Sequence, residues 1–137
     1  MADLLTETGN AATVALKADG DLAAIASRIY NVEAPSMPTW PWILVGSATE
    51  NAREESGYDV ASMSLTVHAF AKGPGQPPTA AIANSIKRVL NGKVVERNGL
   101  QIDFIHEQTQ IIRDSAELSA YHAIVRFSVG VNGEIEG

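Results

Sequence analysis

The stretch SLTVHAFAKGPGQPPTAAIANSIKRVLNG, which runs from Ser64 to Gly92, joins two kinds of periodicity across a short corner. Its first part belongs to a longer run, residues 58–72, in which apolar and polar side chains alternate. Period-two alternation predicts a β-strand with one buried face. The face expected to be buried carries Met63, Leu65, Val67, Ala69 and Ala71. The wetter face carries Ser62, Ser64, Thr66 and His68, and Phe70 interrupts it near the strand's end.

The second part of the stretch has the spacing of an amphipathic helix over residues 79–90. Its apolar positions are Ile82, Ala83, Ile86, Val89 and Leu90. The pair Pro77-Pro78 suits the first turn of a helix, and Asn91-Gly92 suits a C-terminal cap. The sequence therefore predicts a strand that leads into a helix through only a few residues.

The corner between this strand and this helix is rich in glycine and proline, as many phosphate-binding loops are. Such a loop needs G-x-x-x-x-G-K-[ST], because its backbone N–H groups surround phosphate and its lysine neutralises the charge. Here Gly73 and Gly75 are followed by Gln76 and two prolines, which lack N–H donors, and no Lys-Ser/Thr pair follows. We therefore interpret the corner as a rigid, protruding docking element. Its residues are Lys72, Gly73, Pro74, Gly75, Gln76, Pro77 and Pro78.

The N-terminal part of the chain predicts two helices. The first is expected to be firm only from about Asn10 to Ala18, because Gly9 and Asn10 favour a break or a delayed start. Asp21 is expected to cap a short second helix in which Leu22 is apolar.

Prolines separate these helices from a strand. Ile29-Tyr30 looks briefly extended, and Pro35, Pro38 and Pro41 then forbid a helix. Residues 42–47 are expected to form a strand that turns Ile43 and Val45 to one face and Trp42 and Leu44 to the other. Residues 49–57 are polar and are expected to form a connecting loop.

The C-terminal part of the chain predicts further strands. Asn98-Gly99 favours a tight turn between a short strand and a strand over residues 100–105. Alternation weakens over residues 106–113, which predicts a bend or bulge. After a polar turn, residues 121–131 read as a last strand with one strongly apolar face.

Consecutive strands without intervening helices favour an antiparallel sheet. The predicted fold class is α+β: a single domain over residues 1–137, with a mostly antiparallel sheet of about four to five strands and helices packed on one face. Residues 1–9 and 132–137 are expected to be loose termini.

Composition excludes several function classes. The 137 residues include no cysteine, so disulfides and thiolate metal sites are excluded. The net charge is −6 and the bases are scattered, which is unfavourable for binding nucleic acid. No apolar run approaches the roughly 20 residues that span a bilayer, and the segment MADLLTETGN lacks the basic region of a signal peptide. We expect a soluble chain that is made and used in the cytoplasm, or in a particle assembled there.

Candidate catalytic and metal sites are weak. His68 and His122 fall on the wetter faces of strands and are expected to be neighbours, but a zinc site would need a third ligand such as Asp103 or Glu107. Carboxylates become catalytic only in a cleft that shifts their pKa values, and the sequence indicates none. We therefore predict no catalytic residue, no metal and no cofactor.

Two further features are candidate contacts with other chains. A polar contact loop contains Arg53, Glu54 and Glu55. Trp40 is equally compatible with an aromatic hot spot and with packing over the proline loop, whereas Trp42 is expected to anchor the sheet to a helix.

Four stretches together resemble the phage tail completion proteins, also called tail terminators, of long-tailed phages and phage-like gene-transfer particles. They are LKADGDLAAIASRIYN, PTWPWILVG, the opening SLTVHAFAKGPGQPPTAAIANSIKRVLNG and IIRDSAELSAYHAIVRFSV, and they span about Leu16 to Val131. Their order and spacing carry the resemblance. The chain departs from the family pattern at Ala123, where a glycine is expected, and in the stretch before Asn10.

The resemblance implies a structural virion protein, not an enzyme. It implies a ring of six copies that caps the tail tube, ends tail elongation and presents the head-joining surface at the head-proximal end. The implied partners are other copies of the chain, the tail tube protein and the head–tail connector, with DNA passing through the lumen unbound and no membrane involved. Three alternatives stay open: another head–tail adaptor, a minor tail subunit, and a small-ligand-binding domain or enzyme.

Overall fold

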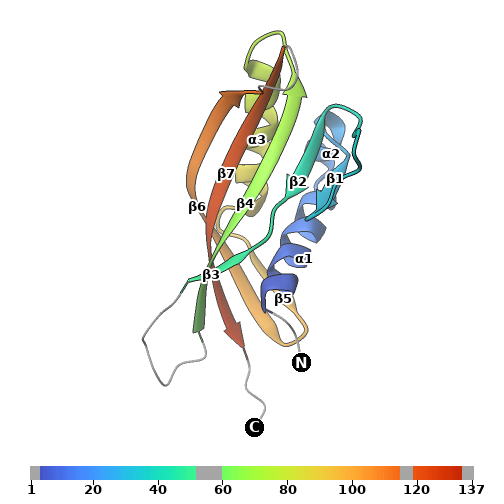
Figure 1. Ribbon diagram of the computed structural model, residues 1–137. Helices are drawn as coiled ribbons and strands as arrows, with labels where there is room; N and C mark the ends of the chain where they lie inside the picture. The colour runs from blue at the N-terminus through green and yellow to red at the C-terminus, as the bar shows by residue number, and fades with distance from the viewer. Residues whose placement is uncertain (1–3, 52–59, 115–118, 134–137) are drawn as a thin grey trace.

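The computed structural model describes residues 4–51, 60–114 and 119–133. They form one α+β domain in which the helices lie on one side of a strongly twisted sheet (Figure 1). The helices are α1 (Leu4–Lys17), α2 (Gly20–Ile25) and α3 (Pro77–Leu90). The strands are β1 (Ile29–Asn31), β2 (Trp42–Val45), β3 (Thr49–Asn51), β4 (Val60–Lys72), β5 (Val94–Arg97), β6 (Leu100–Arg113) and β7 (Ala120–Gly133).

The sheet is larger than predicted and is mixed. It has seven strands in the order β1-β2-β4-β7-β6-β5, and β3 pairs with β4 off this path. β1 runs parallel to β2, whereas the other pairs are antiparallel. The prediction of about four to five strands was wrong because β1 and β3 have only three residues each, which is too few to show an alternating pattern.

Part of the predicted polar loop is a strand. Residues 49–51 form β3, in which Glu50 pairs with Met63 of β4. The remainder of that loop, residues 52–57, and residues 115–118 of the predicted polar turn lie outside the described residues.

The long central strands form the core as predicted. β4 and β7 pair along their length, from Val60 opposite Asn132 to Lys72 opposite Ala120. Their odd-numbered apolar residues from Met63 to Ala71 and from Ala123 to Val131 are buried, which confirms the predicted alternation. α3 buries Ile82, Ala83, Ile86 and Leu90 against the same layer.

α1 begins earlier than predicted. It starts at Leu4 rather than near Asn10, and Gly9 lies buried within it. A Cβ at Gly9 would lie 3.2 Å from the Asn31 side-chain oxygen, so the glycine is explained by close packing against β1 and not by a helix break. Residues 4–9 and 132–133, expected among the loose termini, belong to α1 and β7, whereas residues 1–3 and 134–137 lie outside the described residues.

The cap of α2 also differs from the prediction. Asp19, not Asp21, is the N-cap residue, and its side chain accepts a hydrogen bond of 2.9 Å from the Leu22 N–H. The same carboxylate pairs with Arg88 of α3. One aspartate therefore begins α2 and ties it to the neighbouring helix.

The hairpin and the bulge are confirmed. Asn98 and Gly99 have φ angles of 50° and 81°, as the tight turn between β5 and β6 requires. The register of β6 against β7 shifts between His106 and Gln108. The sheet curls so that the hairpin reaches the N-terminal half of α1 (Figure 1), where Arg97 pairs with Glu7.

Candidate docking surfaces

The corner, residues 72–78, lies at one end of the molecule, where β4 leads into α3 (Figure 1). The Gly73 N–H donates to the Ser119 carbonyl, and a Cβ at Gly73 would lie 2.4 Å from the Gly75 nitrogen. Gly75 has a φ of +70°, in the left-handed region that favours glycine. These constraints give the corner one closely defined shape.

A buried hydroxyl fixes the helix end of the corner. The Thr79 Oγ1 lies 3.4 Å from the carbonyl oxygens of both Ala71 and Tyr121, so it can donate to the end of β4 or to the start of β7. Pro77 and Pro78 occupy the first turn of α3, and the N-cap residue Gln76 makes no side-chain capping bond. The helix start therefore lacks two of the N–H donors that an anion site would use.

An aromatic–histidine cluster lies on the sheet face away from the helices. We define it as Trp40, Trp42, His68, Phe70 and His122. The Phe70 ring stacks between Trp42, with a centroid distance of 4.0 Å, and His122, at 4.3 Å, so the stack crosses β2, β4 and β7. The edge of Trp40 meets Trp42 and Phe70 at 6.2 Å from each, and the Lys72 Nζ lies 5.3 Å from the Trp40 ring centroid.

The two histidines of the cluster form a hydrogen bond, which confirms that they are neighbours. His68 Nδ1 lies 2.8 Å from His122 Nε2. Burial lowers the pKa of His68 below its usual value, and His122 and Arg126 lower it further. Burial also lowers the pKa of His122, although Asp114 opposes this shift. Both imidazoles are therefore neutral at neutral pH, and one nitrogen donates while the other accepts.

The tryptophan predictions need correction. Trp42 does not anchor the sheet to a helix, because it lies on the open face and stacks on Phe70. Its indole N–H is buried and has no hydrogen-bond partner within the described part of the chain. Trp40 is half-buried against this stack, so the chain uses both tryptophans in one cluster.

The polar contact loop and the candidate metal ligand Asp103 are the remaining predicted site residues. Arg53, Glu54 and Glu55 lie outside the described residues. Asp103, considered as a metal ligand, instead accepts a hydrogen bond of 3.0 Å from the Gly130 N–H. Over residues 4–51, 60–114 and 119–133, no three metal-ligating side chains converge.

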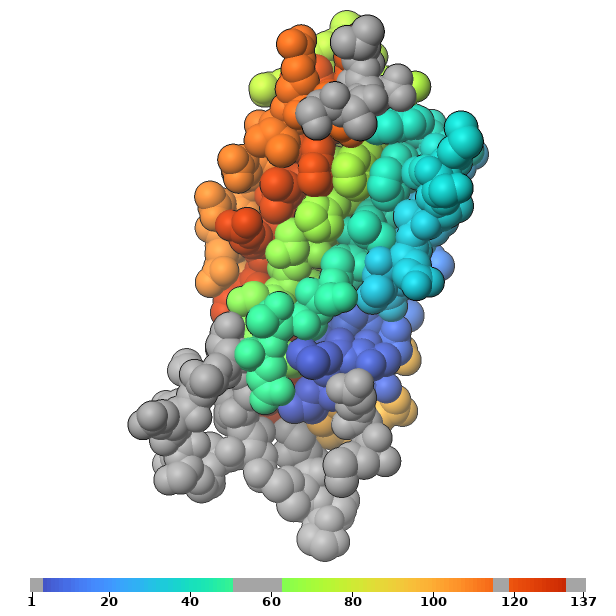
Figure 2. Space-filling model, viewed as in Figure 1, coloured from blue at the N-terminus to red at the C-terminus, as the bar shows by residue number. Residues whose placement is uncertain are grey.

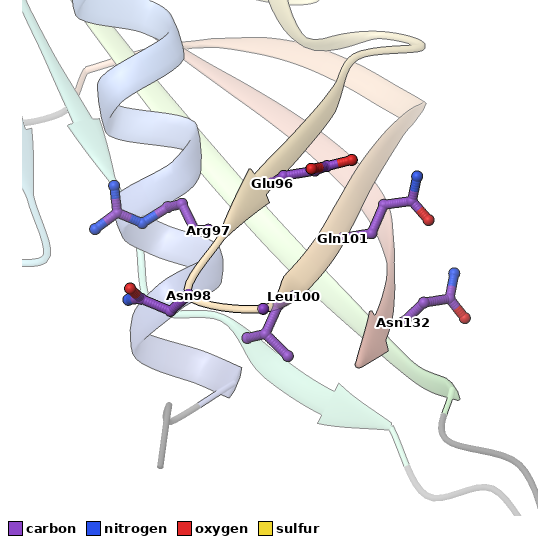
Figure 3. A pocket seen from close by; sticks show the side chains of 7 residues that line it. Glu96, Arg97, Asn98, Leu100, Gln101 and Asn132 are labelled. Atoms are coloured by element: carbon purple, nitrogen blue, oxygen red, sulfur yellow. The ribbon is translucent and has the colours of Figure 1, made fainter. Parts of the chain in front are cut away.

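Two surface hollows differ from what an enzyme site would need. The larger, about 570 Å³, lies at the tip of the β5–β6 hairpin (Figure 3). Its lining contains one carboxylate, Glu96, and no histidine, while Arg97 and Asn98 turn towards α1 (Figure 3). The smaller, about 320 Å³, lies between α1 and the β1–β2 edge, and its lining residues carry no charge. Neither hollow holds an acid–base pair.

The described helices also differ from membrane-spanning segments. None of the three combines the length and the apolar character needed to cross a bilayer.

A family model for the tail completion protein gp17 matches residues 10–132. The chain belongs to this family. It is therefore a structural component of a phage-type tail, as the four sequence stretches predicted. Membership of a structural virion family also makes the enzyme hypothesis unfavourable.

Solved structures share the fold of this tail completion family member. A chain from the virion of a native gene transfer agent (GTA) particle is 16% identical and superposes with a TM-score of 0.81, covering 96% of this chain and 100% of that one. A second solved structure is 13% identical, with a TM-score of 0.64 and 99% of both chains covered. No curated protein sequence matches the chain.

Sequence reasoning missed the stacking of the cluster. In the sequence pattern, Phe70 is only an interruption of a polar face. Because Trp42, Phe70 and His122 come from three strands, their proximity depends on strand order and register. The signal that the sequence did contain was an aromatic residue on the wetter face beside two histidines.

Proposed function

We propose that the chain caps the tail tube, ends tail elongation and provides the surface that joins the head, as a ring of six copies. The match of the tail completion family over residues 10–132 carries this proposal. On this proposal, residues 1–137 act as one domain, assembled in the host cytoplasm and placed at the head-proximal end of the tail.

A ring gives strong binding from weak contacts. A closed head-to-tail ring uses two different patches on each copy, so each copy binds two neighbours. Contacts to the neighbours and to the tube below add through effective concentration. Each interface can therefore be small while the assembled cap is stable.

The rigid parts of the surface are the proposed contacts. The corner, residues 72–78, has one shape and exposes Pro74, Gly75, Gln76 and Pro77, so it can dock with little loss of conformational entropy. Trp40 offers an aromatic contact next to Lys72. The loop with Arg53, Glu54 and Glu55 is a further proposed contact. The partners are a neighbouring copy, the tail tube protein and the head–tail connector.

DNA is proposed to pass through the ring without specific binding. The net charge of −6 disfavours retention of a polyanion, because nucleic-acid binding depends on neutralising phosphates.

The direct test is the assembly of particles without this chain. Tails of uncontrolled length, or full heads beside unattached tails, are expected in electron micrographs. Attached tails of normal length, and infectious or DNA-transferring particles, would overturn the proposal. Tails of normal length that stay unattached would instead indicate a head–tail adaptor.

A second measurement locates the chain. The chain should remain with intact particles after washing, and a label on it should appear at the junction of head and tail. A label along the tail or at its distal tip would identify a minor tail subunit instead.

A further inference from the structure

The dipeptide Asn-Gly occurs three times in the chain, as Asn91-Gly92, Asn98-Gly99 and Asn132-Gly133. An asparagine that precedes glycine can deamidate without an enzyme, because the glycine nitrogen has no side chain beside it and can attack the side-chain carbonyl carbon of the asparagine. The reaction needs a glycine N–H that is free to react, an asparagine side chain that can reach it, and water. The fold gives the three pairs different access to this reaction.

The pair Asn91-Gly92, at the C-terminal end of α3, is protected at both reacting groups. The Gly92 N–H donates to the Phe104 carbonyl at 2.7 Å, so a hydrogen bond holds the nitrogen that would attack. The Asn91 Oδ1 accepts a hydrogen bond of 2.8 Å from the His106 N–H, which fixes the side chain on β6. Ring closure therefore requires both hydrogen bonds to break.

The pair Asn132-Gly133 belongs to strand β7. Asn132 pairs with Val60 of β4 on one side and with Gln101 of β6 on the other. An extended backbone that is paired on both sides resists the rotation that would bring the side chain to the next nitrogen. The sheet therefore restrains this pair.

The pair Asn98-Gly99 forms the tight turn between β5 and β6. Within the described part of the chain, no backbone hydrogen bond holds the Gly99 N–H. Both residues are exposed, and both line the hollow of about 570 Å³ at the hairpin tip, so water reaches the turn (Figure 3). The Asn98 side chain is held at the surface, where its Nδ2 donates to Glu7 Oε2 at 3.0 Å. This pair therefore combines an unbonded nitrogen with exposure to water.

We propose that Asn98 is a site of spontaneous deamidation, and that the modification releases the β5–β6 hairpin from α1. The Gly99 nitrogen attacks the Asn98 Cγ and loses its proton to the solvent, and the side-chain nitrogen leaves as ammonia. Water then opens the resulting succinimide ring at one of its two carbonyls, which gives aspartate or isoaspartate. One water is consumed and one ammonia is released, so the step needs no oxidant and no cofactor.

The new carboxylate changes the contact with α1. In the unmodified chain, Asn98 Nδ2 donates to one Glu7 oxygen while Arg97 Nε donates to the other. Deamidation replaces the amide donor by a carboxylate, and two like charges then lie side by side. Isoaspartate also adds a methylene group to the main chain of a two-residue turn, so the paired ends of β5 and β6 must shift. The modification therefore weakens the tie between hairpin and helix.

Isotope labelling measures the reaction at all three pairs in one sample. The folded chain is incubated in mildly alkaline water enriched in heavy oxygen and is then digested in ordinary acidic water, so that only deamidation during the incubation carries the label. Mass spectrometry of the peptides is expected to show conversion at Asn98 at least about five times faster than at Asn91, where a hydrogen bond must first open. An isoaspartate methyltransferase should modify the same Asn98 peptide.

The chain unfolded in urea is the control for sequence alone. Because the three pairs share the same dipeptide, their rates should become similar once the fold is lost. Equal rates at Asn91 and Asn98 in the folded chain would overturn the inference. So would faster conversion at Asn132 than at Asn98, or conversion of Asn98 only after unfolding.

Two asparagine-to-aspartate variants test the consequence of the modification. Asn98→Asp reproduces one product and keeps the turn, which also favours aspartate. Its melting temperature should fall by a few degrees, and the loss should shrink at high salt because screening weakens the repulsion. The matched control Asn91→Asp adds the same charge but keeps an acceptor for the His106 N–H, so its melting temperature should not change.

A rescue variant ties the loss to Glu7. Glu7→Gln/Asn98→Asp exchanges donor and acceptor across the contact and should recover part of the stability that Asn98→Asp loses. An Asn98→Asp chain as stable as the unmodified one, or a double variant less stable than Asn98→Asp alone, would show that deamidation does not release the hairpin in this way.

Discussion

Glycines in this chain differ according to what lies beside them. Gly46 follows β2, and a Cβ there would lie 2.9 Å from the Thr66 carbonyl oxygen, which the Gly46 N–H also bonds. Gly20 begins α2, and nothing lies within 4 Å of the space that an alanine methyl group would fill there. The first glycine is required by packing, whereas the second is not.

Alanine substitutions at these two glycines should therefore act in opposite directions. Gly46→Ala is expected to lower the free energy of unfolding by about 1–3 kcal/mol, because the β4 backbone must shift. Gly20→Ala is expected to be neutral or to stabilise by up to about 1 kcal/mol. Urea unfolding of both variants checks this, and equal effects would contradict the packing argument.

The histidine pair should make stability depend on pH. The folded-state pKa values of His68 and His122 are lowered, so the unfolded chain binds more protons below its histidine pKa near 6.5. The free energy of unfolding should therefore be greatest above pH 6.5 and should fall as the pH decreases towards 5.

Denaturant unfolding at pH 7.5 and 5.0 measures this effect. The variant His68→Gln/His122→Gln should show a smaller loss than the unmodified chain. Some loss should persist, because burial and Lys87 also lower the pKa of His106. Asp19 does not contribute between pH 7.5 and 5.0, because Arg88 lowers its pKa from the usual value of 3.8. An unchanged pH dependence in the double variant would contradict the assignment.

At the scale of elements, two ion pairs join segments that are distant in the sequence. Arg97 Nε and Asn98 Nδ2 donate to the two Glu7 oxygens at 2.9 and 3.0 Å, and so hold the β5–β6 hairpin on α1. Arg88 Nη2 and Asp19 Oδ2 are closer, at 2.6 Å, and join α3 to α2. Exposure differs: the Glu7 side chain is 13% exposed and the Arg88 side chain 49%.

The coupling energy of each ion pair should depend more on the exposure of its side chains than on its N–O distance. A double-mutant cycle with Glu7→Gln and Arg97→Gln is expected to give a coupling of about 0.5–1.5 kcal/mol, because the carboxylate is mostly shielded from water. A cycle with Asp19→Asn and Arg88→Gln should give a smaller, more salt-sensitive coupling. The reverse order at moderate salt would show that hydrogen-bond length dominates.

At the scale of the whole molecule, the helices cover one face of the sheet and leave the other face of the described residues open (Figure 2). That face carries the aromatic–histidine cluster among polar side chains such as Thr66, Arg126 and Ser128. The corner and the β5–β6 hairpin lie at opposite ends of the molecule (Figure 1). The molecule thus presents separate surfaces, as a subunit with several neighbours needs.

A charge at the corner should impair assembly without affecting folding. Gln76→Arg places a bulky cation at an exposed position that makes no capping bond, so its melting temperature should not change. Particles carrying it should show fewer tails joined to heads. Asn84→Arg, on the exposed side of α3, is the matched control and should assemble normally. Equal assembly of both variants would exclude the corner as a docking element.

Local sequence pattern was sufficient wherever a residue's environment depends on its chain neighbours. Alternation identified β4 and β7 and their buried faces, helical spacing identified α3, and Asn98-Gly99 identified the hairpin turn. These features follow from backbone periodicity and from the φ angles that each residue permits. The resemblance of four spaced stretches also identified the tail completion family.

Only the tertiary structure decided which segments meet. The parallel pairing of β1 with β2, the stack of Phe70 between Trp42 and His122, and the burial of Gly9 against Asn31 all join residues from different elements. The end of the β5–β6 pairing at Asp103 likewise depends on the fold and not on a local pattern. A local pattern fixes which face of a strand is apolar, but strand order and register, set by the packing of the entire core, fix what that face touches.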